Sequence, residues 1–148
     1  MFVQIVVSRR SALPNSIPSL VFETARKQAR LVADGLITSE ELVTAHLEQI
    51  ERVNPSVNAI ITLVADLAMR KARAADKARM SGEQLGPLHG LPIAIKDLQE
   101  TAGIRTTHGS PIYIDNVPGQ DALIVERVKQ AGAIVIGKSN TPEFGAGS

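Results

Sequence analysis

The sequence contains no cysteine and no tryptophan, and it has only one tyrosine and three phenylalanines. Without cysteine, these residues form no disulfide and offer no thiolate as a nucleophile or metal ligand. The scarcity of aromatic side chains disfavours binding of single-stranded nucleic acid, which stacks its bases on aromatic platforms. No apolar run approaches the roughly 20 residues needed to cross a bilayer. We therefore expect neither a nucleic-acid partner nor a membrane.

Net charge is also nearly absent, because 16 lysines and arginines balance 15 acidic residues to a formal net charge of +1. A hydrophobic content of 44% over 148 residues is enough for the core of one compact domain. We expect residues 1–19 to form a disordered leader, since Pro14 and Pro18 interrupt it. Residues 20–148 are expected to belong to a single domain, and we expect the protein to be cytoplasmic.

Helical spacing of apolar residues predicts two helices in the first part of the chain. The first has one apolar face, formed by Phe22, Ala25, Ala29 and Val32. Gly35 is placed to end this helix as its C-cap. The second is expected to begin at the capping box that runs from Thr38 to Glu41. Asn54-Pro55 is expected to stop it, because a residue before proline avoids helical geometry.

The rest of the chain alternates strands and helices. Residues 58–64 and 91–95 are short β-rich or apolar runs, and each predicts a strand. Between them, a third helix is expected to bury one face, formed by Ala68, Ala72 and Ala75. Residues 101–119 are rich in glycine and proline and predict an extended surface excursion.

A final helix and strand are predicted after this excursion. The helix is expected to begin at Asp121, turn Ile124, Val128 and Ala131 inward, and stop at Gly132. Residues 133–136 then predict another buried strand. Two buried strands joined through a helix favour a right-handed parallel crossover, and so an α/β fold.

Lys96 is the main candidate for chemistry. Strand alternation puts Ile93 and Ile95 on one face, and Ala94 and Lys96 on the other. Lys96 would then lie at the carboxyl end of a buried strand, where α/β proteins place their sites. A desolvated lysine has a lowered pKa and can serve as a general base. From strand position alone, the alternative is that Lys96 and Asp97 are merely two solvated charges.

Several ordered segments, however, resemble the amidase signature family. The string GPLHGLPIAIKD, ending at Asp97, is closely similar to that family's lysine motif. The similarity continues through TAGIRTTHGSPIY and DALIVERVKQAGAIVIGKSNTPEFGAGS. Upstream, DGLITSEELVTAHLEQIERVNPSVNAIIT resembles the family's N-terminal region, so the resemblance covers roughly residues 20–148. It implies the N-terminal helices and first strands of an α/β/α fold with a mixed sheet, as the N-terminal portion of a general amidase.

This resemblance also implies a reaction. Family members hydrolyse carboxylic amides with a Ser–cis-Ser–Lys triad, in which Lys96 would be the base. The expected partner is a small-molecule amide, with no cofactor and no metal, and the protein could form a homodimer. No GGSSGG-like string occurs among the 148 residues, so both serines are expected to be missing and the chain alone to be inactive. Thr106, Thr107 and Gly109 resemble a loop near the family's active site, but turn hydrogen bonds would explain them equally well.

Two other functions compete with a general amidase. The chain could belong to the amide-cleaving subunit of a tRNA-dependent amidotransferase, which feeds ammonia to a partner. Alternatively, it could be an inactive remnant or an interaction fragment, which the missing serines favour. The segment NTPEFGAGS, ending at Ser148, resembles the general amidases more than the amidotransferase component.

Overall fold

The computed structural model describes residues 20–147, so the expected leader at residues 1–19 lies outside the described residues. Helices and strands follow in the order α2 (Ala25–Ala33), α3 (Ser39–Val57), β1 (Ile60–Leu63), α4 (Ala65–Met80), β2 (Pro92–Lys96), α5 (Leu123–Gln130) and β3 (Ile134–Ser139). Two short 3-10 turns are η1 (Pro111–Tyr113) and η2 (Glu143–Gly145). None of the helices in this described part is both long and apolar enough to cross a membrane.

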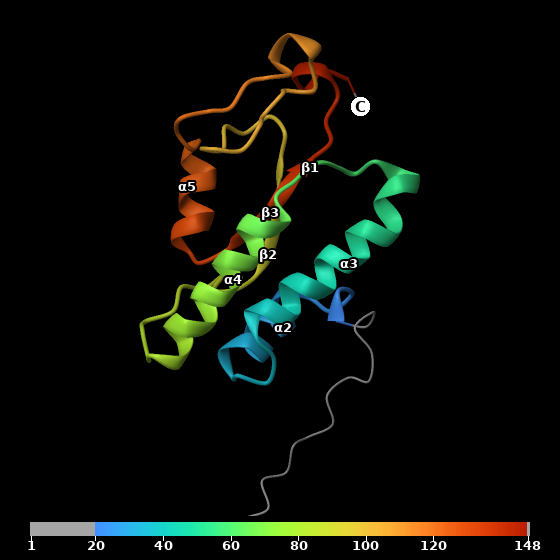
Figure 1. Ribbon diagram of the computed structural model, residues 1–148. Coiled ribbons are helices and arrows are strands. Elements are labelled where there is room, and N and C mark those ends of the chain that lie inside the picture. Colours follow the sequence, from blue (N-terminus) through green and yellow to red (C-terminus); the bar gives the residue numbers. More distant parts are fainter. Residues whose placement is uncertain (1–19, 148) are drawn as a thin grey trace, which may run out of the picture.

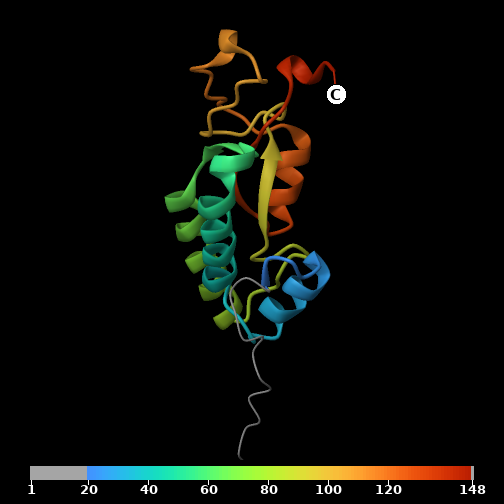
Figure 2. The same ribbon diagram turned by 90° about the vertical axis from the view of Figure 1, so that its right-hand side faces the viewer.

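The three strands form one mixed sheet in the order β1-β3-β2. β3 is central, parallel to β2 and antiparallel to β1. The expected parallel pairing is therefore confirmed, and β1 adds the antiparallel strand that makes the sheet mixed. Helices α3 and α4 lie on one side of the sheet and α5 on the other (Figures 1 and 2). This is the three-layered α/β arrangement that the sequence predicts.

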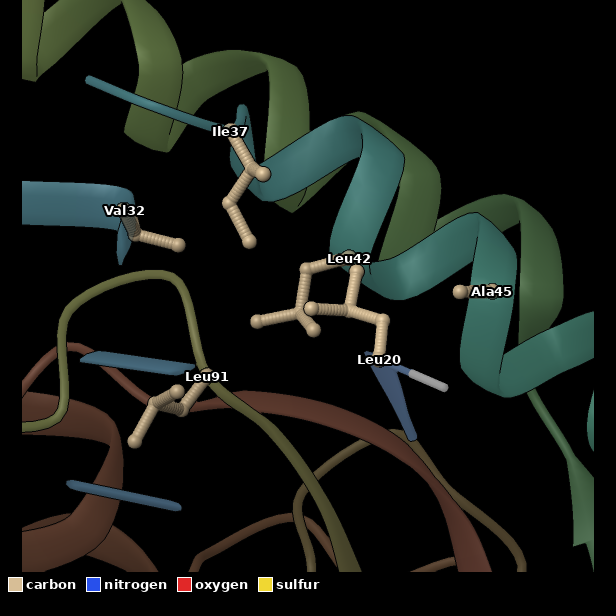
Figure 3. Close-up of a cluster of buried hydrophobic side chains, with 6 residues drawn as sticks. All are labelled: Leu20, Val32, Ile37, Leu42, Ala45 and Leu91. Atoms are coloured by element: carbon tan, nitrogen blue, oxygen red, sulfur yellow. The ribbon is translucent and has the colours of Figure 1, made fainter. Parts of the chain in front are cut away.

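The buried apolar residues form three clusters that follow these layers. Leu20, Val32, Ile37, Leu42, Ala45 and Leu91 join α2 and α3 to the segment that leads into β2 (Figure 3). A second cluster packs α3 and α4 on the sheet through Val43, Ala68, Ala72, Ile134 and Ile136. The third packs α5 on the opposite face through Ile95, Ile104, Val125 and Val135. Both faces of the sheet are thus buried, which holds β2 and β3 in place.

Two expected helix faces are partly wrong. Phe22 lies before α2 and is 76% exposed, so it does not extend the apolar face of that helix. In α5, Ile124 is 56% exposed, and Val125 is the fully buried residue. The helix begins at Leu123, with Ala122 as its N-cap, rather than at Asp121. This two-residue shift rotates the buried face by one position.

Helix α3 begins as predicted and ends later than predicted. Thr38 and Glu41 form the reciprocal hydrogen bonds of a capping box. Pro55, however, lies inside the helix, which continues to Val57 and ends at Asn58 in left-handed geometry, with φ of 47°. The Asn54 side chain donates to the Ile60 carbonyl and accepts from its amide. These contacts tie the last helical turn to the start of β1 and offset the hydrogen bond that proline removes.

A second cap for α3 comes from a distant helix. Asp76, which is buried on α4, accepts hydrogen bonds from the amides of Ser39 (2.7 Å) and Glu40 (3.0 Å). The carboxylate satisfies two of the free amides at the helix start and opposes the positive end of the helix dipole. Asp76 therefore joins α3 to α4 by its charge as well as by packing.

We expect Asp76→Ala to lower the free energy of unfolding by about 2 kcal/mol, because two buried amides lose their acceptor. Urea denaturation of the native chain and the variant measures this change. Asp66→Ala removes an exposed carboxylate from the same helix and is the control, with an expected loss of under about 1 kcal/mol. Equal losses in the two variants would contradict the role given to Asp76.

Strand β3 is longer than predicted and contains an irregularity that matters for the site. Ile93 pairs with Val135, but the next residue, Ala94, pairs with Gly137, so Ile136 is an extra residue in β3. Such a bulge reverses the side-chain alternation that follows it. Lys138 consequently pairs with Ile95, whose face packs against α5, and is directed to that side of the sheet.

Candidate functional site

Lys96 is the last residue of β2, as predicted, and pairs with Ser139 of β3. In Figure 2 the strand points toward the end of the molecule where the loops of residues 101–119 and the C-terminal segment gather. The Lys96 side chain is exposed, and no residue in the range 20–147 forms an ion pair with it. The desolvation expected for a lysine base is therefore not provided by this part of the chain.

Asp97 holds the backbone directly after Lys96. Its side chain is fully buried, and its Oδ2 accepts hydrogen bonds from the Thr107 amide (3.0 Å) and the Thr107 hydroxyl (2.5 Å). The Asp97 amide donates to Ser139 O, and its carbonyl accepts from the His108 amide. Asp97 thus points away from Lys96 and serves the backbone, in agreement with the alternation expected from the sequence.

The three weaker candidates lie in one loop beside this strand end. Thr106 is fully buried, and its hydroxyl donates to the carbonyl of Ile104. The Thr107 hydroxyl binds Asp97, and Gly109 has a left-handed backbone with φ of +69°. The two threonine hydroxyls are engaged within the protein, as the alternative based on turn hydrogen bonds predicts. A contact of Thr106, Thr107 or Gly109 with substrate stays a prediction.

Gly109 is required at its position by two separate effects. A Cβ atom there would lie 2.7 Å from Thr141 O and 2.8 Å from Pro142 O, and its positive φ strains any other residue. We expect Gly109→Ala to cost about 2 kcal/mol in urea denaturation. Gly103→Ala is the matched control, because Gly103 has φ of +72° but no atom within 4 Å of an added Cβ. A smaller cost at Gly103, about 1 kcal/mol, isolates the strain from the clash.

Lys138 is the residue near this site that the sequence did not single out. Its side chain is fully buried, and its Nζ donates to Gln99 O (2.5 Å), Thr101 Oγ1 (2.9 Å) and Thr106 Oγ1 (2.8 Å). Burial lowers the pKa of Lys138 from 10.5 to about 8, although the nearby carboxylates of Asp97 and Glu100 oppose the shift. Regular alternation would have placed Lys138 with Ile134 and Ile136. Only the lysine within an otherwise apolar strand could have signalled its role.

No group of three or more histidine, aspartate and glutamate residues suited to a metal ion occurs within residues 20–147. The chemistry on this part of the chain is therefore that of a single exposed amine at a rigid strand end, supported by one buried carboxylate and one buried ammonium. Such an amine can accept a proton when neutral, but the described residues bring no nucleophile into hydrogen-bond contact with it.

A family model described as Amidase matches residues 41–148. The chain belongs to the amidase family. Among curated relatives, a glutamyl-tRNA(Gln) amidotransferase component from Moorella thermoacetica, its A chain, is 45% identical over 129 residues, which are 87% of this chain and 26% of that protein. The protein of the same name from Acidothermus cellulolyticus is 41% identical over equal shares. The chain therefore spans about a quarter of the length of these relatives.

Solved structures of amidase family members share the fold of this chain. The native peptide amidase from Stenotrophomonas maltophilia aligns with a TM-score of 0.78 and 32% identity, over 87% of this chain and 26% of that chain. A bacterial aryl acylamidase of the amidase signature family has a TM-score of 0.78 and 27% identity, over 83% and 26% of the two chains. The expected N-terminal portion of an amidase-signature fold is thus confirmed.

Proposed function

We propose that this chain supplies the lysine base of an amide-hydrolysing site whose two serines come from sequence outside these 148 residues. The observation that carries the proposal is the place of Lys96, exposed at the carboxyl end of β2 within the segment that resembles the family's lysine motif. Asp97 and the paired strand β3 hold the backbone there, so the position of the amine is set before any substrate binds.

The proposed reaction is acyl transfer to serine. Neutral Lys96 takes a proton through the bridging serine, and the nucleophilic serine attacks the amide carbonyl carbon. The carbon–nitrogen bond breaks, and the amine or ammonia leaves with a proton. Water then attacks the acyl-serine ester and releases the acid. Because the amine of Lys96 is exposed in the described part, the serine-bearing segment must also shield it from water for it to act as a base.

A second candidate is the amide-cleaving component of an amidotransferase that acts on glutamyl-tRNA(Gln). Identities of 41–45% with proteins of that name favour it, against 27–32% for the two amidases of solved structure. The resemblance of the NTPEFGAGS segment favours the general amidases instead. In the amidotransferase, glutamine would be the amide, and its ammonia would pass to a partner. A cytoplasmic location fits either candidate and stays a prediction, as does a homodimer.

The test is a comparison of this chain with a chimera, in which residues 20–148 replace the corresponding quarter of the Moorella thermoacetica relative. We expect the chimera to release ammonia from glutamine or a simple amide, and to label with a serine-directed fluorophosphonate. The chain alone should do neither. Stoichiometric serine labelling of the chain alone would contradict the proposal. A folded chimera that labels but releases no ammonia would favour the inactive remnant.

A further inference from the structure

Lys138 is a buried cation that the proposed reaction does not use. It lies on β3, one residue before Ser139, the strand partner of Lys96. Its three acceptors, Gln99 O, Thr101 Oγ1 and Thr106 Oγ1, all belong to the segment that follows β2. A charged lysine costs free energy at a fully buried position, so packing alone does not account for it.

The contacts of Lys138 have a fixed direction. The Thr101 hydroxyl donates to Gln99 O and the Thr106 hydroxyl donates to Ile104 O, so both threonine oxygens are available to Lys138 as acceptors. Three acceptors require three N–H groups, which only the ammonium form has. Lys138 therefore holds three points of the 99–106 segment at once.

This segment leads directly to the residues that bind Asp97. Thr107 follows Thr106, and its amide and hydroxyl bind the Asp97 carboxylate, while the His108 amide binds the Asp97 carbonyl. Asp97 is covalently next to Lys96. We propose that Lys138 is a positioning residue for Lys96, which acts through the 99–106 segment and Asp97. This inference rests on the proposed role of Lys96 as the base.

The charged groups around Lys138 come from every neighbouring segment. Asp97 after β2, Glu100 in the loop and Asp121 before α5 favour its charge, and Lys129 on α5 disfavours it. Lys129 is itself bound to both carboxylate oxygens of Asp121. No carboxylate in the described part forms an ion pair with Lys138. Neutral oxygens of the loop are therefore its hydrogen-bond partners, and removing the amine releases the loop rather than a salt bridge.

Amide hydrogen exchange of the chain, followed residue by residue by NMR, tests this arrangement. We expect Lys138→Met to speed exchange of the Thr107 and His108 amides at least about tenfold, with the Leu42 amide of α3 unchanged. Lys77→Met, an exposed lysine of α4, is the matched control and should change neither region. Exchange of Thr107 and His108 within twofold of the native rate in folded Lys138→Met would overturn the inference.

A second variant covers the case in which Lys138→Met does not fold. Thr106→Val keeps the side-chain shape and removes one acceptor of Lys138. It should also speed Thr107 and His108 exchange, whereas Thr44→Val, on α3, should not. Unchanged exchange in Thr106→Val, in the absence of a folded Lys138→Met, would overturn the inference.

Catalysis by the chimera distinguishes positioning from mere structural support. Per active site titrated with fluorophosphonate, Lys138→Met should lower kcat at least tenfold and leave KM within twofold, and Lys138→Arg should restore part of kcat. An unchanged kcat per titrated site would overturn the inference. Faster loop exchange in Lys138→Met, together with hydrolysis that does not depend on Lys96, would instead overturn the proposed function and the inferred action on Lys96, leaving only the loop contact. The two failures are therefore distinguishable.

Discussion

Lys96→Ala is expected to lower amide hydrolysis by the chimera at least about 10³-fold, because the serine would then have no base to take its proton. The loss should appear in kcat, since proton transfer belongs to the chemical step rather than to substrate binding. Ammonia release under saturating amide measures it. Stability should change little, because the Lys96 side chain is exposed and forms no ion pair within residues 20–147.

The matched control is Lys77→Ala, which removes another exposed lysine, from α4. It should leave kcat within twofold of the unmodified chimera. Lys96→Arg is a further variant, because a guanidinium stays charged and cannot accept the proton. It should be as inactive as Lys96→Ala. Turnover by Lys96→Ala within tenfold of the unmodified chimera would refute the assignment of Lys96 as the base.

Raising the pH from 8 to 10.5 is expected to stabilise the native chain relative to Lys138→Met by about 3 kcal/mol. Burial lowers the pKa of Lys138 to about 8, against 10.5 for an ordinary lysine. Between these values the unfolded chain binds a proton that the folded chain has released, so the free energy of unfolding rises with pH. Each pKa unit corresponds to about 1.4 kcal/mol. Below pH 8 both states are protonated, and the full cost of the buried charge is present.

Urea denaturation of both chains at several pH values from 7 to 10.5 measures this difference. Comparison with the variant is essential because Tyr113 and the other lysines also titrate in this range. Lys129→Met is the control, since it removes a lysine of α5 that is ion-paired and partly exposed. Its stability should run parallel to that of the native chain as pH rises. Parallel curves for native chain and Lys138→Met would contradict the buried, depressed lysine.

Much of the fold was accessible from sequence because its signals are local. The capping box at Thr38 and the end of β2 at Lys96 each depend on a few neighbouring residues, and the structure confirms both. Pro55 was misjudged because a local rule was overridden by a contact from Asn54 to Ile60. Phe22 and Ile124 were assigned to buried faces from spacing alone, although the helices begin after or just before them.

The candidate site divides in the same way. The order of the motifs alone leads to the family and to Lys96, because the chain carries that information in consecutive residues. Lys138 lies 42 positions later than Lys96 in the chain, and its contacts with Gln99, Thr101 and Thr106 form across a sheet and a loop.

What the sequence by itself determined is therefore the family, the parallel strand pair and Lys96 at the end of its strand. Only the tertiary structure decided which side chains support that strand end. The extra residue at Ile136 reverses the alternation of β3 and turns Lys138 toward α5, and the folding back of residues 99–108 closes around both Lys138 and Asp97. The physical reason is that a bulge and a loop closure are set by pairing between distant segments, which no local pattern records.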